Sequence, residues 1–411
     1  MPFIMLTVLI DMVSIGLIIP VLAPLIGTFT KSQAEQAFWY GAITIVFGIA
    51  NFFGSPILGR LSDRYGRRPV LLIGFSGLAL SFFVTGLATA LWMLVVVRLF
   101  SGAMQSNIAV ANAYVADITP PAERAKAFGK LGAMLGMGFS LGPVIGGLLG
   151  GISLQLPFFV AGSLAIVNWL YGYFVLPESL PVERRQPFVL REANPVNSLR
   201  GLTELKGVGA LVVVIGLSGL AQFMTHTSWV LYTTFKFGWG PTQNGWSLFA
   251  IGLMSVLVQG VFLSRLLKRF SPQRLGVMGL VSSSICFVLW GLATEGWMMY
   301  VIIFANVLGF AVSASIQSLI ANAADPTTQG RTAGAVGSLN SMMAVLAPAI
   351  GAPLLAAVSH LPHGDWRIGA PFYFCAALQA ASALIALRHF RRARLQRAAC
   401  AATGAAAVPT I

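Results

Sequence analysis

The chain has 411 residues, of which 57% are hydrophobic and only 9% are charged, and its mean hydropathy is +0.81. A soluble domain carries about a quarter charged residues, so this composition excludes an ordinary soluble protein and predicts a membrane protein. The net charge of +14 would favour a nucleic-acid partner in a soluble protein. In this chain the distribution of the charge indicates membrane topology instead.

Long apolar stretches recur along the whole chain. A helix needs about 20 apolar residues to cross the roughly 30 Å hydrocarbon core of a bilayer. Most connections between the stretches are short, which favours a helical bundle over a β-barrel. Twelve transmembrane helices are expected, near 3–26, 38–59, 70–90, 92–116, 127–151, 155–176, 208–234, 244–267, 273–293, 297–321, 331–357 and 368–390.

Lysine and arginine gather in alternate connections. One set holds 22 of the 26 basic residues, and the opposite set holds three. Because basic residues stay on the cytoplasmic side, we place the first set and both termini in the cytoplasm. We expect a multi-pass protein of the bacterial inner membrane, with its basic tail against anionic lipid headgroups. The cytoplasmic set comprises 60–69, 118–130, 177–207, 265–274, 322–331 and 388–397.

Motifs of the first half return 205 residues later. LGRLSDRYGRRPVLLIG at 58–74 aligns with LSRLLKRFSPQRLGVMG at 263–279, and LGPVIGG at 141–147 aligns with LAPAIGA at 346–352. The repeat predicts an all-α membrane protein of two six-helix halves, with a substrate site between them near the midplane. The predicted parts are an N-terminal half, a cytoplasmic linker, a C-terminal half and a basic cytoplasmic tail, at 1–176, 177–207, 208–390 and 391–411.

Two charged residues, Asp11 and Arg98, fall well inside apolar stretches. A charge at the bilayer centre costs about 2.5–3.5 kcal/mol on insertion scales, so such residues are commonly functional. We expect Asp11 to take up and release protons, and Arg98 to lie at a similar depth and pair with it. The pair is either a switch that substrate or proton binding breaks, or a static contact between two helices.

The turn at 59–72 reads GRLSDRYGRRPVLL. We expect Asp63 at a helix N-terminus, where the dipole favours an anion, with arginine partners that also reach Asp117 or Glu123. This cluster is expected to latch the two halves together on the cytoplasmic side when the protein faces outward. The alternative is that its positive charge only anchors the topology. The candidate gating residues are Gly59, Asp63, Arg64, Gly66, Arg67 and Arg68.

Small residues recur along the stretch 127–151, several of them four residues apart. Small residues at this spacing let helices pack closely, and a proline within the stretch bends the helix. The pattern predicts either a kinked seam that resists proton leak and lets the halves rock, or ordinary packing. The residues of this glycine–proline pattern are Gly129, Gly138, Gly142, Pro143, Gly146 and Gly147.

Polar and aromatic side chains inside apolar stretches are candidates for contacting a substrate. Trp229 and Tyr232 either stack on a planar ligand or belong to the interfacial aromatic belt, and we favour the belt. His226 is either a proton carrier, because histidine titrates near neutral pH, or a packing residue. The candidate substrate-binding residues are Gln105, Asn107, Asn112, Gln222, Trp229 and Gln317, and the candidate proton-coupling residues are Asp11, Arg98, Asp117 and His226.

No phosphate-binding glycine loop, metal-ligand spacing or nucleophile–base pair stands out in the sequence. We therefore expect neither an enzyme nor an ATP-driven pump, and no metal or cofactor. The expected partners are protons and membrane lipids, with no nucleic acid. We expect the chain to act as a monomer.

These motifs resemble the major facilitator superfamily, and within it the tetracycline efflux branch of the twelve-helix drug–proton antiporters. The resemblance implies the major facilitator fold and export of tetracycline-type drugs, by alternating access, in exchange for inward-moving protons. It covers most of the N-terminal half and the linker and is thinner afterwards. It is carried by LIDMVSIGLIIPVLAPLI around Asp11, the turn at 59–72, RLFSGAMQ from Arg98, AYVADIT around Asp117, the glycine–proline pattern from Gly129 to Gly147, and LPES at 176–179.

The second half departs from that branch. The branch has a histidine and an aspartate implicated in proton coupling where this chain has Ser255 and Ser283, so His226 is a candidate to replace the missing histidine. The departure also leaves open a different substrate. The alternatives are an exporter of another amphipathic drug or metabolite, and a non-transporting membrane receptor or scaffold.

Overall fold

The computed structural model describes residues 1–105, 107–120, 123–188, 209–323 and 329–403, although some side chains near 317–336 and beyond 392 lie outside this description. Within these ranges the secondary structure is entirely helical, which confirms the all-α prediction. Eleven helical segments of the described chain are long and apolar enough to span a membrane, and Gly296–Ala305 forms a shorter apolar helix. The protein is therefore a multi-pass membrane protein.

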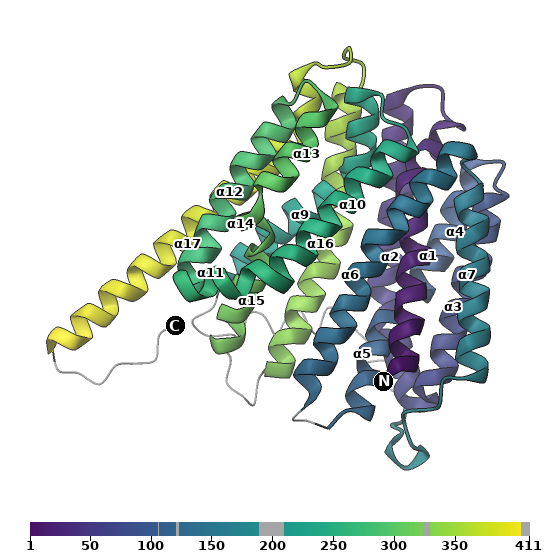
Figure 1. Ribbon diagram of the computed structural model, residues 1–411, viewed down its shortest axis with the longest axis horizontal. Helices are drawn as coiled ribbons and strands as arrows, with labels where there is room; N and C mark the ends of the chain where they lie inside the picture. The colour runs from purple at the N-terminus through teal and green to yellow at the C-terminus, as the bar shows by residue number, and fades with distance from the viewer. Residues whose placement is uncertain (106, 121–122, 189–208, 324–328, 404–411) are drawn as a thin grey trace.

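The helices form two groups that lie side by side (Figure 1). The first group, called the N-half, comprises α1 (Pro2–Gly27), α2 (Gln33–Tyr65), α3 (Arg67–Gly86), α4 (Leu91–Met104), α5 (Asn107–Ile118), α6 (Arg124–Ile152) and α7 (Leu156–Phe174). The second group, called the C-half, comprises α9 (Gly209–Phe237), α10 (Pro241–Leu257), α11 (Leu263–Arg269), α12 (Pro272–Leu292), α13 (Gly296–Ala305), α14 (Val307–Phe310), α15 (Val312–Ala323), α16 (Gln329–Val358) and α17 (Ala370–Thr403). The basic end, which carries Met1 and the α2–α3 turn, lies at the bottom of Figure 1.

Two of the expected continuous helices are interrupted near their middles. The stretch 92–116 breaks at Gln105 (φ −86°, ψ 64°), where α4 ends. The stretch 297–321 breaks at Asn306 (φ −81°, ψ 36°), where α13 ends. The side-chain amide of Asn51 donates to the carbonyl oxygen of Gln105 at 2.9 Å and satisfies one backbone group that the break frees. Matching broken helices in the two halves of a transporter commonly lie at its binding site.

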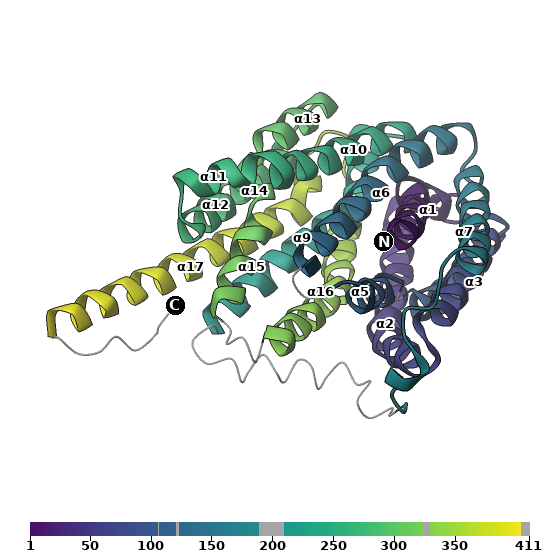
Figure 2. The same cartoon turned by 60° about the horizontal axis from the view of Figure 1, so that its bottom comes forward.

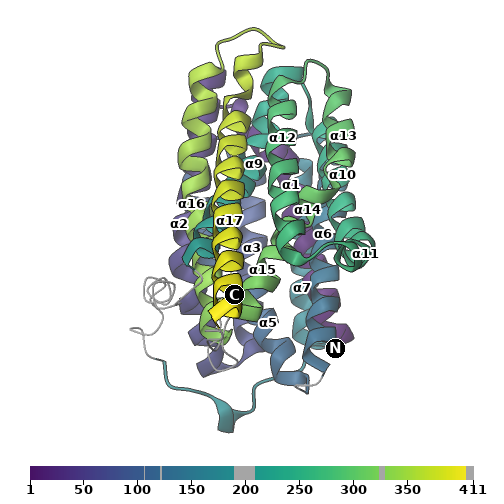
Figure 3. The same cartoon turned by 90° about the vertical axis from the view of Figure 1, so that its left-hand side faces the viewer.

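The two halves pack closely at the end opposite the basic end. A Cβ atom placed on Gly41 of α2 would lie 2.4 Å from the Cβ of Ala352 on α16, and one on Gly147 of α6 would lie 2.6 Å from the carbonyl oxygen of Pro241 on α10. The hydroxyl of Thr242 donates to the carbonyl of Gly147 at 3.1 Å across the same interface. Figure 3 shows α16 running beside α2. We call these two contacts the α2–α16 and α6–α10 seams.

Toward the basic end both seams part. A Cβ on Gly136 would still lie 3.4 Å from Val256, but one on Gly132 or Gly129 of α6 would meet nothing within 4 Å, and the same holds for Gly337 of α16. In Figure 1 the lower part of the C-half leans away from the N-half, most clearly at α17, and Figure 2 shows this end turned toward the viewer. In the part of the chain that is described, the two halves are therefore closed against each other at one end and open at the basic end.

Large aromatic side chains fill the interior of the C-half near its closed end. Trp229 is 1% exposed and Tyr232 is fully buried, and both rings pack against Phe372, with centroids 6.1 and 4.5 Å away. The interpretation of Trp229 and Tyr232 as interfacial belt residues is therefore wrong. Helical spacing alone does not tell which face of a helix meets lipid, and here these side chains face their own half.

Candidate functional site

Asp11 lies in the middle of α1 and is 5% exposed. Its carboxyl oxygen accepts one hydrogen bond, at 3.1 Å, from the side-chain amide of Asn107, the first residue of α5 beyond the break in the helix. Asn107 fits because α3 offers Gly74 there: a Cβ at Gly74 would lie 2.1 Å from its amide oxygen. The carboxyl is thus held by a neutral donor. A buried carboxyl without a cation is a suitable group for taking up a proton.

The expected contact between Asp11 and Arg98 is not formed in this structure. Among the described ion pairs none joins the two residues, and the guanidinium of Arg98 lies over the ring of Phe47 at 5.8 Å. The two helices do share a cavity, because Ile15, one turn from Asp11, lines the same space as Arg98. The predicted pair is therefore not formed in this conformation, because the carboxyl of Asp11 is hydrogen-bonded to Asn107 instead.

The cavity beside Arg98, called the N-cavity, has a volume of roughly 210 Å³. Most of its lining is aliphatic or aromatic, and Arg98 supplies its one charged group. Gln105, at the break between α4 and α5, forms part of its wall. The lining residues are Ile15, Ile18, Ile19, Leu22, Tyr40, Ile43, Thr44, Phe47, Leu78, Ser81, Phe82, Arg98, Ser101 and Gln105.

The C-half holds a second cavity of roughly 120 Å³ at the other helix break, called the C-cavity. His226 lies on its wall with its ring nitrogen 3.5 Å from the amide nitrogen of Gln222. Ser255 and Ser283 line the same cavity, as do Trp229 and Asn306. The imidazole thus lines the same cavity as Ser255 and Ser283, the two positions at which the tetracycline efflux branch has its histidine and aspartate. His226 itself lies on a different helix from either serine.

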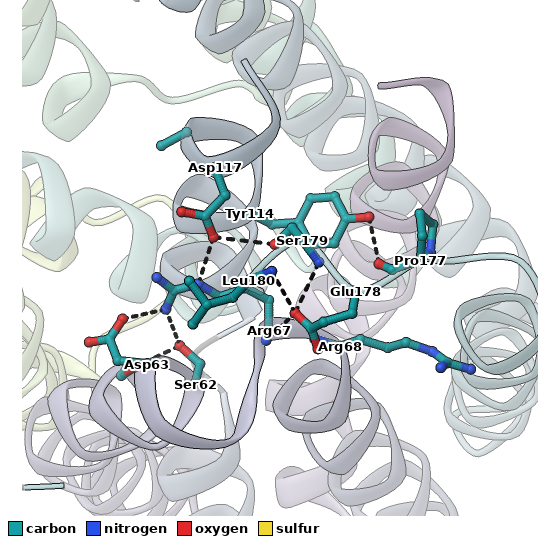
Figure 4. A network of polar contacts seen from close by, with 12 residues as sticks. Ser62, Asp63, Arg67, Arg68, Tyr114, Asp117, Pro177, Glu178, Ser179 and Leu180 are labelled. Atoms are coloured by element: carbon teal, nitrogen blue, oxygen red, sulfur yellow. Dashed lines mark hydrogen bonds and ion pairs between the residues drawn. The ribbon is translucent and has the colours of Figure 1, made fainter. Parts of the chain in front are cut away.

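The α2–α3 turn forms a compact charge network (Figure 4). Arg67 is 8% exposed. Its guanidinium contacts Asp63 at 2.6 Å and Asp117 at 3.0 Å, and it donates to the hydroxyl of Ser62 at 2.6 Å. Asp117 also accepts from the hydroxyl of Ser179 at 3.2 Å. The predicted pairing of an arginine of this turn with Asp63 and Asp117 is confirmed for Arg67. Asp117, a candidate for proton coupling, thus pairs with Arg67 and Ser179.

Glu178 is the residue of this network that sequence reasoning missed. Its carboxylate accepts from the backbone N–H groups of Arg67 at 2.8 Å and Arg68 at 3.2 Å, at the N-terminus of α3, where the helix dipole favours an anion. The approach needs Gly66, whose φ is 106° and whose added Cβ would lie 2.3 Å from the carboxylate. The available signal was LPES itself, an acid placed just after α7.

The predicted helix N-terminus at Asp63 is therefore wrong, because α2 continues to Tyr65 and Glu178 caps α3 instead. The side chain of Arg68 reaches the carbonyl oxygen of Tyr173 on α7, and Arg64 lies over the ring of Tyr65 at 5.1 Å. Every residue of this network belongs to the N-half or to the start of the linker. In this conformation the contacts of the cluster among the described residues tie the N-half together and do not reach the C-half.

The glycines of the glycine–proline pattern on α6 pack against two different helices. Gly138, Gly142 and Gly146 face α1, where an added Cβ would lie 2.4 Å from the Cβ of Met12, 2.6 Å from the Cα of Gly16 and 2.0 Å from the carbonyl of Leu17, respectively. Gly147 and the carbonyl of Pro143 face α10 across the α6–α10 seam. Gly129 and, on α2, Gly59 meet nothing within 4 Å, so close packing does not explain them here.

The remaining candidate substrate residues have mixed placements. Gln105 lines the N-cavity, and Gln222 and Trp229 line the C-cavity. The side-chain amide of Asn107 donates its hydrogen bond to Asp11, and that of Asn112 donates to the carbonyl of Ile108 on its own helix. The side chain of Gln317 lies outside the described residues, as do most of the linker and the end of the tail. No group of three or more His, Cys, Asp or Glu that could hold a metal occurs in the described part of the chain.

Comparison with known proteins gives consistent matches over nearly the whole chain. A family model described as Major Facilitator Superfamily matches residues 4–348 and 211–410. The class C tetracycline resistance protein of Escherichia coli is 35% identical over 368 residues, which cover 89% of this chain and 92% of that protein. The class B protein of Escherichia coli is 32% identical over 371 residues, which cover 89% of this chain and 91% of that protein.

Solved structures agree on the fold. The nucleoside transporter NupG superposes with a TM-score of 0.76 at 14% identity, over 94% of this chain and 98% of that one. The human organic anion transporter MFSD10 superposes with a TM-score of 0.69 at 23% identity, over 94% and 98%. At these identities the likeness concerns the arrangement of the helices.

Proposed function

This chain belongs to the major facilitator superfamily, and from that premise we propose that it exports tetracycline-type drugs in exchange for protons. Relatives named for tetracycline resistance match it over about nine tenths of both chains. The observation that carries the mechanism is Asp11, a buried carboxyl held by a neutral amide one turn below a cavity. Such a group can exchange a proton as the substrate comes and goes.

The orientation follows from the charge distribution. Placing the basic end in the cytoplasm of a bacterial inner membrane satisfies the positive-inside rule and puts both termini on that side. The conformation described above is then open to the cytoplasm, with the α2–α16 and α6–α10 seams closing the outer side. We take 1–176 and 208–390 as the two moving halves, joined by a cytoplasmic linker at 177–207 and followed by a lipid-facing basic tail at 391–411, in a protein that acts as a monomer.

The transport cycle uses the two cavities and the two ends of the bundle. In the cytoplasm-open state Asp11 gives up its proton and the drug enters between the halves, beside the breaks at Gln105 and Asn306. The outer seams then part and the basic end closes, which exposes the site to the outside. The drug leaves, Asp11 takes up a proton, and the halves return. His226 in the C-cavity is the second group we assign to proton coupling.

A second candidate function is export of another amphipathic drug or metabolite by the same cycle. The observation that favours it is the lining of the C-cavity, where Ser255 and Ser283 stand at the positions of a histidine and an aspartate in the tetracycline efflux branch. A change of lining at this site alters which polar groups of a substrate are satisfied, and unsatisfied buried polar groups discriminate strongly between ligands.

The test is drug susceptibility of an efflux-deficient host that expresses the chain, read against tetracyclines and unrelated amphipathic drugs. Asp11→Asn is expected to lose resistance completely while reaching the membrane in normal amount, because an amide cannot exchange a proton. Glu295→Gln is the matched control, since it removes an exposed carboxylate at the outer end. Full resistance in the Asp11 variant overturns the mechanism, and resistance to unrelated drugs alone selects the second candidate.

A further inference from the structure

Arg98 has no hydrogen-bond acceptor among the described residues. A guanidinium carries five N–H donors and cannot be deprotonated in a protein. The guanidinium lies 5.8 Å from the ring of Phe47 and also interacts electrostatically with Tyr40, whose hydroxyl is neutral. Its nitrogen atoms are nevertheless not sealed within the packing, because Arg98 lines the N-cavity and is half-buried. Its donors are therefore available to something that enters the cavity.

The rest of the N-cavity offers no countercharge. Its described polar groups are the neutral hydroxyls and amide of Tyr40, Thr44, Ser81, Ser101 and Gln105. An unpaired cation in a low-dielectric, mostly aliphatic space is costly, and the same environment makes its attraction for an anion stronger than in water. A guanidinium matches the two oxygens of a planar acidic group especially well.

The carboxyl of Asp11 does not fill this role in the cytoplasm-open state. Asn107 holds it at 3.1 Å, and it is not among the residues that line the N-cavity. Ile15 does line that cavity and follows Asp11 by four residues, or about 6 Å along a helix. The carboxyl therefore lies about one turn from a site whose own charge is positive.

We propose that the N-cavity is a recognition site for an acidic oxygen, a carboxylate or an enolate, on an amphipathic substrate whose apolar body packs against the isoleucines of α1. This deepens the proposed function and rests on it for the assumption that the cavity is a transport site.

A pair of fluorescent probes isolates the acidic group. Nε-dansyl-lysine and dansylcadaverine share the same ring system, chain and amine and differ only in one carboxylate. With the full chain in nanodiscs, dansyl-lysine is expected to bind at least about tenfold more tightly, equivalent to about 1.4 kcal/mol. Equal binding of the two probes to the unaltered protein overturns the proposal without the use of any variant.

Variants then locate the effect. Arg98→Met is expected to abolish the preference, and Arg98→Lys, which keeps the charge but not the planar fork, to retain part of it. Lys31→Met removes an equal charge at the exposed outer end and should leave the preference unchanged. A preference that survives in Arg98→Met places the acidic group elsewhere and refutes the assignment.

Failure of this inference is distinguishable from failure of the proposed function, because the binding assay needs no transport. A carboxylate preference at Arg98 without tetracycline resistance leaves the site intact and removes the drug assignment. Proton-driven tetracycline resistance without such a preference removes the site and leaves the exporter.

Discussion

The α6–α10 seam allows a quantitative prediction about the equilibrium between the two conformations. A Cβ atom at Gly147 would lie 2.6 Å from the carbonyl oxygen of Pro241 and 2.9 Å from the Cα of Gly245, whereas real Cβ atoms keep at least 3.0 Å from such neighbours. Gly147→Ala therefore pushes α6 and α10 apart by at least about 0.4 Å, the difference between 2.6 and 3.0 Å, and the obstructing atoms are backbone.

Overpacking of this kind costs about 1–3 kcal/mol. The cost falls on the conformation in which the outer seam is closed, because the seam parts in the other one. The equilibrium should move toward the outward-open state by roughly 5- to 150-fold, the range to which 1–3 kcal/mol corresponds. A carrier held in one state cycles slowly, so efflux should fall as well.

The assay is a distance measurement between spin labels on the exposed outer residues Gln155 and Glu295, in a variant without its native cysteines. Gly147→Ala should shift the distance distribution to longer values. Gly132→Ala is the matched control, since it makes the same change on the same helix where nothing lies within 4 Å. Identical distributions for the two variants would refute the steric reasoning.

Two further predictions concern the charge network of the α2–α3 turn. Glu178→Gln weakens the cap of α3 and should lower the free energy of unfolding by about 1–2 kcal/mol, which is measured as a lower thermal midpoint. Glu183→Gln, at an exposed linker position, should leave the midpoint unchanged. Equal midpoints for the two variants would contradict the capping role of Glu178. Arg67→Lys cannot serve both carboxylates that the guanidinium contacts. The Arg67 variant should therefore slow efflux several-fold at unchanged membrane insertion, whereas Arg64→Lys should not. Wild-type efflux rates in the Arg67 variant would leave topology anchoring as the role of Arg67.

The positions of the helices followed from the sequence because hydrophobic length is a local property. The breaks at Gln105 and Asn306 did not, since a single amide within an apolar run carries no distinctive local pattern. They depend on partners far along the chain, as when Asn51 donates to the freed carbonyl of Gln105. Trp229 was misplaced at the interface for a similar reason: its neighbours in the interior, Trp290 and Phe372, come from later helices.

The site was predicted unevenly for the same reason. Asp63 and Arg67 lie four residues apart beside the same turn, so their pairing could be expected from the local sequence. Glu178 lies 111 residues from Arg67, and nothing local to either residue announces that contact. Asp11 was correctly expected to be buried, but its partner is the neutral Asn107 and not Arg98, because charge alone cannot rank competing donors at similar depth.

The amide beside Asp11 has a kinetic consequence. An asparagine side chain offers a donor at one end and an acceptor at the other. By turning end for end it can serve a carboxylate through its nitrogen and a carboxylic acid through its oxygen, in the room that Gly74 leaves. A hydrogen ion arriving at or leaving this group therefore changes which atom faces it and separates no pair of opposite charges, so the slow step of turnover should lie in the swing of the helices.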